Sequence, residues 1–142
     1  QRWDHEVGKG SFDANPDSWR WGQSNIRHGA FCEGLELFDP KIFNLSVNES
    51  RGMDPNQRQI LEIAYEGLWN AGLRKKDFFN SNAACYVGMA ISDWNWVDKL
   101  AEVQQNIGNG SVACIFSNRV NYTLGLKGPS VTVDQEGATA IT

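Results

Sequence analysis

The stretch Met53-Asp54-Pro55-Asn56-Gln57-Arg58 opens the clearest element of the sequence. Asp54 offers a carboxylate N-cap, Pro55 suits the first helical position, and Gln57 can return a hydrogen bond to the cap. Apolar residues then recur at steps of three and four, which predicts one buried helix face. That face comprises Ile60, Leu61, Ala64, Leu68 and Trp69. Gly72 follows as a left-handed C-cap, so the sequence predicts a helix over residues 55–71.

Two short strands are predicted downstream of this helix. Residues 84–89 form a short apolar run that suits a buried parallel strand, and Val131-Thr132-Val133 suits a second one. Strands separated by helices indicate an α/β layered domain with a parallel or mixed sheet. Two strands alone do not complete such a sheet, so we interpret the chain as part of a larger domain.

Two further helices are predicted between the strands. Asp93 can cap one in which Trp94, Val97 and Leu100 share a face. Residues 106–110 are rich in Gly and Asn and predict a flexible connection. The next helix is predicted to begin at a Ser111 cap and to end at Gly125. Its apolar positions are spaced four apart, at Val112, Phe116, Val120 and Leu124.

The N-terminal part of the chain shows no persistent helical or alternating period over residues 1–38. The long irregular segment is predicted to extend to residue 52, ahead of the ordered part at 53–142. A loop of this length inside a compact domain is either functional or laid over a larger body. Trp3, Trp19 and Trp21 favour the second alternative, because they need apolar surface on which to bury.

Composition limits the function further. The 142 residues are 41% hydrophobic and carry a formal net charge of −4, which excludes intrinsic disorder as the main state and disfavours nucleic-acid binding. The longest apolar run, residues 83–91, is far shorter than the roughly 20 residues that span a membrane. No secretory signal is visible, so we expect a chain that is not secreted. Cys32, Cys85 and Cys114 form no C-x-x-C pair, and His5 and His28 lack metal-ligand spacing, so no metal site is predicted.

The last segment carries the chemistry of most interest. Asp134-Gln135-Glu136-Gly137-Ala138 bends sharply after the second predicted strand. A strand followed by a tight turn into a helix is how several α/β enzymes expose a nucleophile beside backbone N–H donors. Here Gly137 has no side chain and Ala138 has only a methyl group. The residues alone therefore leave open an ordinary strand–helix connection in which glycine relieves backbone strain.

Motifs along most of the chain resemble those of β-ketoacyl synthase (ketosynthase) domains of type I polyketide and fatty acid synthases. The most specific is Met53-Asp54-Pro55-Asn56-Gln57-Arg58 followed by Leu61-Glu62, which is similar to the family's M-D-P-Q-Q-R-x-x-L-E. The other matching stretches are Arg2-Trp3-Asp4, Leu37-Phe38-Asp39-Pro40-Lys41-Ile42-Phe43, Ala71-Gly72-Leu73, Tyr86-Val87-Gly88, Asn118-Arg119-Val120-Asn121-Tyr122 and Leu124-Gly125-Leu126-Lys127-Gly128-Pro129-Ser130.

The resemblance implies a thiolase-like α/β fold, layered α-β-α-β-α, of which residues 1–142 are an incomplete N-terminal part. It implies decarboxylative condensation of acyl and malonyl thioesters carried on the phosphopantetheine of an acyl carrier protein. No bound cofactor is expected, and the full domain is expected to be a homodimer. Such a synthase would lie in the cytoplasm or a plastid, without nucleic-acid or membrane partners. The family's two assisting histidines lie downstream, so neither His5 nor His28 takes those roles.

The chain departs from the family at the nucleophile. The family's V-D-T-A-C-S-S-S falls on residues 133–140 without a gap, which places Gly137 at the position of the catalytic cysteine. Covalent catalysis needs an atom that can form the thioester, so acyl-enzyme chemistry is expected to be absent. Gln135 is displaced by two residues from the position where some relatives carry Gln. Glu136 as a base and Cys114 as a relocated nucleophile are weaker alternatives than a solvated turn residue and an inert core cysteine.

Three functions remain open at this stage. The chain is a non-condensing ketosynthase-like domain, an active synthase with an unidentified nucleophile, or a structural and dimerisation scaffold. If the alignment holds, Gly137 is expected at a strand-to-helix turn within the core.

Overall fold

The computed structural model describes residues 17, 20, 29–90, 92–97 and 107–141. The chain divides into two compact units, Gln1–Gly34 and Leu35–Thr142, and the elements below belong to the second. No helix in the described ranges has the length and apolar character needed to cross a membrane. The elements, in chain order, are η2 (Pro40–Phe43), α1 (Val47–Gly52), α2 (Pro55–Asn70), α3 (Lys75–Phe78), β1 (Cys85–Gly88), η3 (Trp94–Trp96), α4 (Ile107–Ser111), α5 (Ala113–Leu124), β2 (Ser130–Val133) and η5 (Glu136–Ile141).

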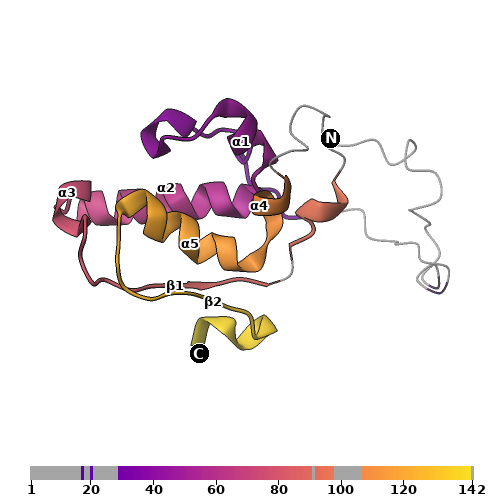
Figure 1. Ribbon diagram of the computed structural model, residues 1–142. Coiled ribbons are helices and arrows are strands. Elements are labelled where there is room, and N and C mark those ends of the chain that lie inside the picture. Colours follow the sequence, from indigo (N-terminus) through magenta and orange to yellow (C-terminus); the bar gives the residue numbers. More distant parts are fainter. Residues whose placement is uncertain (1–16, 18–19, 21–28, 91, 98–106, 142) are drawn as a thin grey trace. The chain divides into compact units, whose positions relative to one another are not determined.

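The two strands form a parallel pair, as predicted, with Cys85 opposite Ser130 and Gly88 opposite Val133. Parallel strands require a crossover connection, and α5 is its principal helix. Helices α2 and α5 lie on one side of the pair, while η5 lies on the other (Figure 1). The layers α2/α5, β1/β2 and η5 therefore confirm the α/β prediction.

The core lies between η2, α2 and α5. Its buried members are Phe43, Met53, Leu61, Val120 and Leu124. The Phe43 ring also stacks on Phe38, with centroids 5.3 Å apart, and meets the Tyr65 ring edge-on at 6.1 Å. Burial of these large side chains is the main stabilising contribution in this part of the chain.

The first turn of α2 is a buried joint. Asp54 is 1% exposed and caps the helix through its Oδ1, which accepts a 2.7 Å hydrogen bond from the Asn56 N–H. Its Oδ2 accepts a hydrogen bond from the Ser92 hydroxyl, and its own N–H donates to the Gly110 carbonyl at 2.8 Å. The predicted cap is confirmed. It also attaches two distant segments of chain to the start of α2.

Gln57 does not complete a capping box, so that prediction is wrong. Its side chain, 1% exposed, accepts a 2.7 Å hydrogen bond from Arg119 Nε of α5 and donates to the Asn109 carbonyl of α4 at 3.3 Å. Arg119 Nη1 also pairs with Glu49 Oε1 of α1 at 2.8 Å. The Asp54 N–H that a capping box would use donates instead to the Gly110 carbonyl, and the largely buried Arg119 guanidinium offers Gln57 a charged and therefore stronger partner.

The end of α2 differs from prediction at one residue. Gly72 has φ +78° directly after the Ala71 C-cap, which confirms the left-handed helix end. Trp69, however, is 51% exposed and does not belong to the buried face. The Arg74 guanidinium lies over the Trp69 ring, 3.5 Å from its centroid, and donates to the Trp69 carbonyl. The stacking of the Arg74 guanidinium on the ring and its hydrogen bond to the Trp69 carbonyl stabilise the indole in this partly exposed position.

The predicted irregular segment is wrong at its C-terminal end. Residues 40–52 contain η2 and α1, whose caps are Asp39 and Ser46. The Ser46 hydroxyl accepts from the Glu49 N–H at 3.1 Å, so short side-chain caps stabilise helices that have no apolar period. Trp3, Trp19 and Trp21 lie outside the described residues.

The crossover also differs from prediction. The helix expected from Asp93 is only the short η3, and Leu100 lies outside the described residues. Residues 107–111 form α4 instead of a flexible connection, and α5 is capped by Val112. Ser111 ends α4, where its hydroxyl donates to Asn95 Oδ1. The short α3 has no counterpart in the prediction because one helical turn leaves no periodic pattern.

Gly110 shows how closely the joint at α2 is packed. A Cβ at this position would lie 2.0 Å from the Gly52 carbonyl oxygen. We predict that Gly110→Ala lowers the free energy of unfolding by about 1–3 kcal/mol, because backbone must shift to relieve the overlap. Urea denaturation followed by circular dichroism measures the change.

Gly108→Ala is the matched control, because Gly108 lies in the same helix with open space around its Cβ position. That variant is expected to be as stable as the natural chain, or more stable by up to about 1 kcal/mol, since Ala is the better helix former. Equal stabilities for the two variants would contradict the close approach of Gly110 to Gly52.

Candidate functional site

The turn after β2 is held by its own backbone and short side chains. The Glu136 N–H donates to Asp134 Oδ1 at 3.1 Å, and the Ala138 N–H donates to the Gln135 carbonyl at 3.0 Å. Glu136 has φ +50°, the left-handed region that a non-glycine residue rarely adopts. A strained backbone at one residue is typical of turns that the surrounding structure holds in place.

Gly137 is the second residue of η5 and directly follows the strained Glu136. Its φ lies outside the left-handed region, and no atom lies within 4 Å of the place a Cβ would occupy. The predicted strand-to-helix turn is therefore confirmed. The predicted burial within the core is wrong, because Gly137 is exposed. Its side of the sheet is covered only by η5 in the described part of the chain (Figure 1).

The Thr139 side chain stabilises the turn through hydrogen bonds to its backbone. Its hydroxyl accepts a 2.8 Å hydrogen bond from the Gln135 N–H and donates to the Glu136 carbonyl at 2.7 Å. The side chain is half-buried, whereas Gln135, Glu136 and Ala138 are exposed. The residue pattern did not single out Thr139 as functional, because an ordinary hydroxyl in a turn gives no distinct sequence signal.

The cysteines lie elsewhere. Cys114 is exposed in the first turn of α5, so its predicted place on the core face is wrong. The deeper thiol is Cys85 on β1, which packs against the core, and burial raises its pKa. Helix α5 and η5 lie on opposite sides of the strand pair (Figure 1), so Cys114 is not part of the turn at Gly137. His5 and His28 fall outside the described residues.

No metal-binding group emerges from the described side chains: nowhere among them do three His, Cys, Asp or Glu residues gather closely enough to hold an ion. The turn itself offers one carboxylate from Asp134 and one from Glu136, both exposed. Residue 137 has no thiol, hydroxyl or amine, so it offers only its backbone atoms to a substrate. A covalent intermediate therefore cannot form on its side chain.

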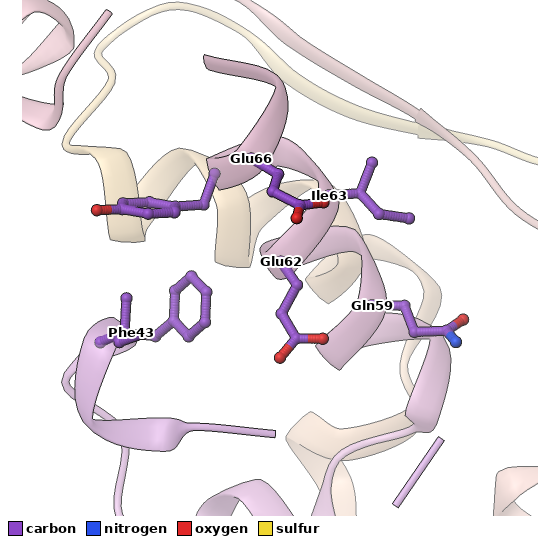
Figure 2. Close-up of a pocket in the computed structure, with 7 residues that line it drawn as sticks. Phe43, Gln59, Glu62, Ile63 and Glu66 are labelled. Carbon is purple, nitrogen blue, oxygen red and sulfur yellow. The ribbon is translucent and has the colours of Figure 1, made fainter. Parts of the chain in front are cut away.

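A separate hollow lies between η2 and α2, far from the turn in the chain. Its volume is about 520 Å³, and it is lined by Ile42, Phe43, Gln59, Glu62, Ile63, Tyr65 and Glu66. Figure 2 shows Glu62 extending into the hollow beside Phe43, while Gln59 and Ile63 point away from that ring. Burial raises the pKa of Glu62, and the nearby Glu66 carboxylate adds to this against the opposing charge of Arg58.

The comparison with known families identifies the kind of domain that contains this turn. The family model for "Beta-ketoacyl synthase, N-terminal domain" matches residues 2–142, almost the whole chain. The chain belongs to the β-ketoacyl synthase family. The strand pair, the turn at Gly137 and the buried M-D-P-x-Q-R joint are therefore parts of a ketosynthase domain.

Curated relatives are polyketide synthases. The chain is 36% identical over 132 residues to the reducing polyketide synthase FUB1 of Gibberella moniliformis, an alignment that covers 90% of this chain and 5% of the relative. It is 38% identical to erythronolide synthase EryA3 of Saccharopolyspora erythraea, over 84% of this chain and 4% of the relative. It is also 31% identical to the 6-methylsalicylic acid synthase of Aspergillus niger, over 98% of this chain and 9% of the relative. The chain thus spans less than a tenth of each relative.

Solved ketosynthases share the fold. The oxazolomycin ketosynthase domain OzmH KS7 of Streptomyces albus superposes with a TM-score of 0.75 at 23% identity, over 99% of this chain and 24% of that chain. The ketosynthase from module 6 of the bacillaene synthase of Bacillus subtilis gives a TM-score of 0.62 at 26% identity, over 77% of this chain and 18% of that chain. The predicted thiolase-like fold, present in part, is confirmed.

The raised pKa of Glu62 predicts a pH-dependent gain in stability on its neutralisation. A carboxyl whose folded pKa is raised binds its proton more tightly in the folded state, so its ionisation at neutral pH opposes folding. Glu62→Gln should therefore raise the melting temperature at pH 7. This gain should disappear as the pH falls below the unfolded value of about 4.3.

Glu36→Gln, at an exposed glutamate, is the control for removing one negative charge. Thermal unfolding from pH 3.5 to 7 compares both variants with the natural chain. A Glu62→Gln gain that is the same at every pH would contradict a raised pKa for this carboxyl.

Proposed function

We propose that this chain belongs to a non-condensing ketosynthase of a polyketide synthase. In this role the domain binds acyl chains on the phosphopantetheine of an acyl carrier protein and does not take them over as a thioester. No bound cofactor is required for such binding. The family reaction, decarboxylative condensation of acyl and malonyl thioesters, stops at its first step because no nucleophile receives the acyl group.

The observation that carries the proposal is the vacant side-chain position at Gly137. This residue occupies the family's cysteine position in the ungapped motif, and the turn around it is formed and exposed. Its backbone is free of left-handed strain, and open space surrounds the place of a Cβ. The turn therefore has the geometry to present a side chain at residue 137, where this chain has no reactive atom.

Neighbouring groups do not supply a substitute nucleophile. The Thr139 hydroxyl donates to the Glu136 carbonyl, so its proton and its orientation serve the turn. A carboxylate at Glu136 can act as a base but is a poor acceptor of an acyl group under mild conditions, since the anhydride formed is more reactive than the thioester. Cys114 belongs to α5, which lies on the other side of the strand pair from η5 (Figure 1).

Carrier-protein binding and homodimerisation of the full domain are part of the same proposal. Membership of the β-ketoacyl synthase family supports both, as do relatives that are polyketide synthases. A purely structural role within the synthase is the competing function, and it predicts that residue 137 has no special access to acyl thioesters.

The proposal is tested by restoring the thiol. The natural chain and the Gly137→Cys variant are each incubated with an acyl-pantetheine thioester. Both proteins are then digested, and mass spectrometry of the peptides locates the acyl group. We expect an acyl group on residue 137 of the variant and none between residues 134 and 141 of the natural chain. Cys32 and Cys114 are exposed in both proteins and report the background rate.

Gly108→Cys is the matched control, because Gly108 is also exposed with open space at its Cβ position. Faster acylation at residue 137 than at residue 108 supports a turn built to hold an acyl acceptor. Equal rates at the two positions favour the structural role. Acylation of the natural chain within residues 134–141 contradicts the loss of the nucleophile.

A further inference from the structure

We propose that Thr139 is a positioning residue that fixes the backbone of residues 135–137 and seats this turn on β1 through Gly88. The inference deepens the proposed function, because it concerns the turn that would present a nucleophile. It rests on contacts within the turn and between the turn and the sheet. Neither kind of contact depends on which side chain residue 137 carries.

The first contact is a pair of hydrogen bonds from one hydroxyl. Thr139 Oγ1 accepts from the Gln135 N–H at 2.8 Å and donates to the Glu136 carbonyl at 2.7 Å. The two bonds hold the peptide group before Gln135 and the peptide group after Glu136, and so bracket the strained Glu136, whose φ is +50°. They add to the Glu136–Asp134 and Ala138–Gln135 hydrogen bonds in offsetting the free energy that the left-handed conformation costs.

The second contact is steric and involves the methyl group of the same residue. A Cβ built on Gly88 would lie 2.8 Å from Thr139 Cγ2, so the methyl occupies the space above this glycine. Gly88 is the last residue of β1 and is paired with Val133, the last residue of β2. Thr139 therefore holds the turn against the end of the strand pair, and Gly88 provides the room for this approach.

Together the two contacts define the direction of residue 137. The hydroxyl fixes the peptide group that joins Glu136 to Gly137 and the one before Gln135, and the methyl fixes the distance of η5 from the end of β1. Threonine is the only residue type that combines a β-hydroxyl and a β-methyl. Two substitutions separate the contributions, because Val is isosteric with Thr and keeps only methyl groups, whereas Ser keeps the hydroxyl and loses the methyl.

The first test uses the natural chain and amide hydrogen exchange. In Thr139→Val the Gln135 amide loses its acceptor, and we expect its exchange to rise by about five- to tenfold, the effect of one lost hydrogen bond. In Thr139→Ser the exchange should stay near the natural rate. Amides in α2 report global stability, so an unchanged α2 with a faster Gln135 identifies a local effect.

The second test adds Gly137→Cys to each variant and follows alkylation of the new thiol by iodoacetamide against pH. With the turn held, the thiol has one environment, in the first turn of η5 and close in sequence to the exposed carboxylates of Asp134 and Glu136, and this environment sets its alkylation midpoint. Thr139→Val should move the midpoint toward the ordinary thiol value of about 8.5, and Thr139→Ser should leave it in place. A role limited to overall stability would not move this midpoint.

The outcomes are distinguishable from those of the acylation test, because iodoacetamide needs no acyl-binding surface. Unchanged Gln135 exchange in Thr139→Val, or equal alkylation midpoints for Val and Ser, overturns the inference even if acylation succeeds. If Thr139→Val fails to fold, Gly88→Ala displaces Thr139 from the side of β1, since the new methyl would lie 2.8 Å from Thr139 Cγ2 and would move the hydroxyl away from its partners. Faster Gln135 exchange in Gly88→Ala supports the inference, and natural exchange overturns it.

Discussion

The hydrogen bond between Arg119 Nε and Gln57 Oε1 is the interaction on which the rest of the unit Leu35–Thr142 depends. It joins α5 to α2 in the interior, and each partner reaches a further element: Arg119 pairs with Glu49 of α1, and Gln57 donates to the Asn109 carbonyl of α4. A guanidinium and an amide buried at this depth are costly unless every polar atom finds a partner. The four helices are therefore constrained to meet in one arrangement, and that arrangement places α5 over the strand pair.

This constraint explains the strongest family motif in physical terms. In M-D-P-x-Q-R, Met53 fills the core, Asp54 caps α2, and Gln57 binds the arginine of the later N-R motif. The L-G-L-x-G-P-S motif has a similar role. A Cβ on Gly128 would lie 2.3 Å from the Ala83 carbonyl oxygen, so only glycine allows the chain before β2 to run beside the chain before β1. Both motifs hold separate segments of the chain together, and neither contributes a reactive group to the turn at Gly137.

The sequence predicted the elements whose stability comes from their own pattern. Helix α2, the two strands and most of α5 have an apolar period or a β-branched run, and all were located correctly. Helix α4 was missed because Ile-Gly-Asn-Gly-Ser is a poor helix by propensity, and its Gly110 is required by the contact with Gly52. Gln57 was assigned to the wrong partner because its true partner, Arg119, is 62 residues away. A local pattern carries no information about such a partner.

The two sides of the strand pair have different roles, and this separation has a consequence for how such chains evolve. The joints that determine folding lie with α2 and α5, while the turn at Gly137 lies with η5 on the opposite side. Selection against misfolding acts most directly on the first side, where most of the buried contacts lie. A chain of this family can therefore change at the turn after β2 while the motifs that connect α2, α5 and the strands are retained. Those motifs therefore identify relatives that share the fold. Whether a relative also shares the reaction depends on the residue at position 137.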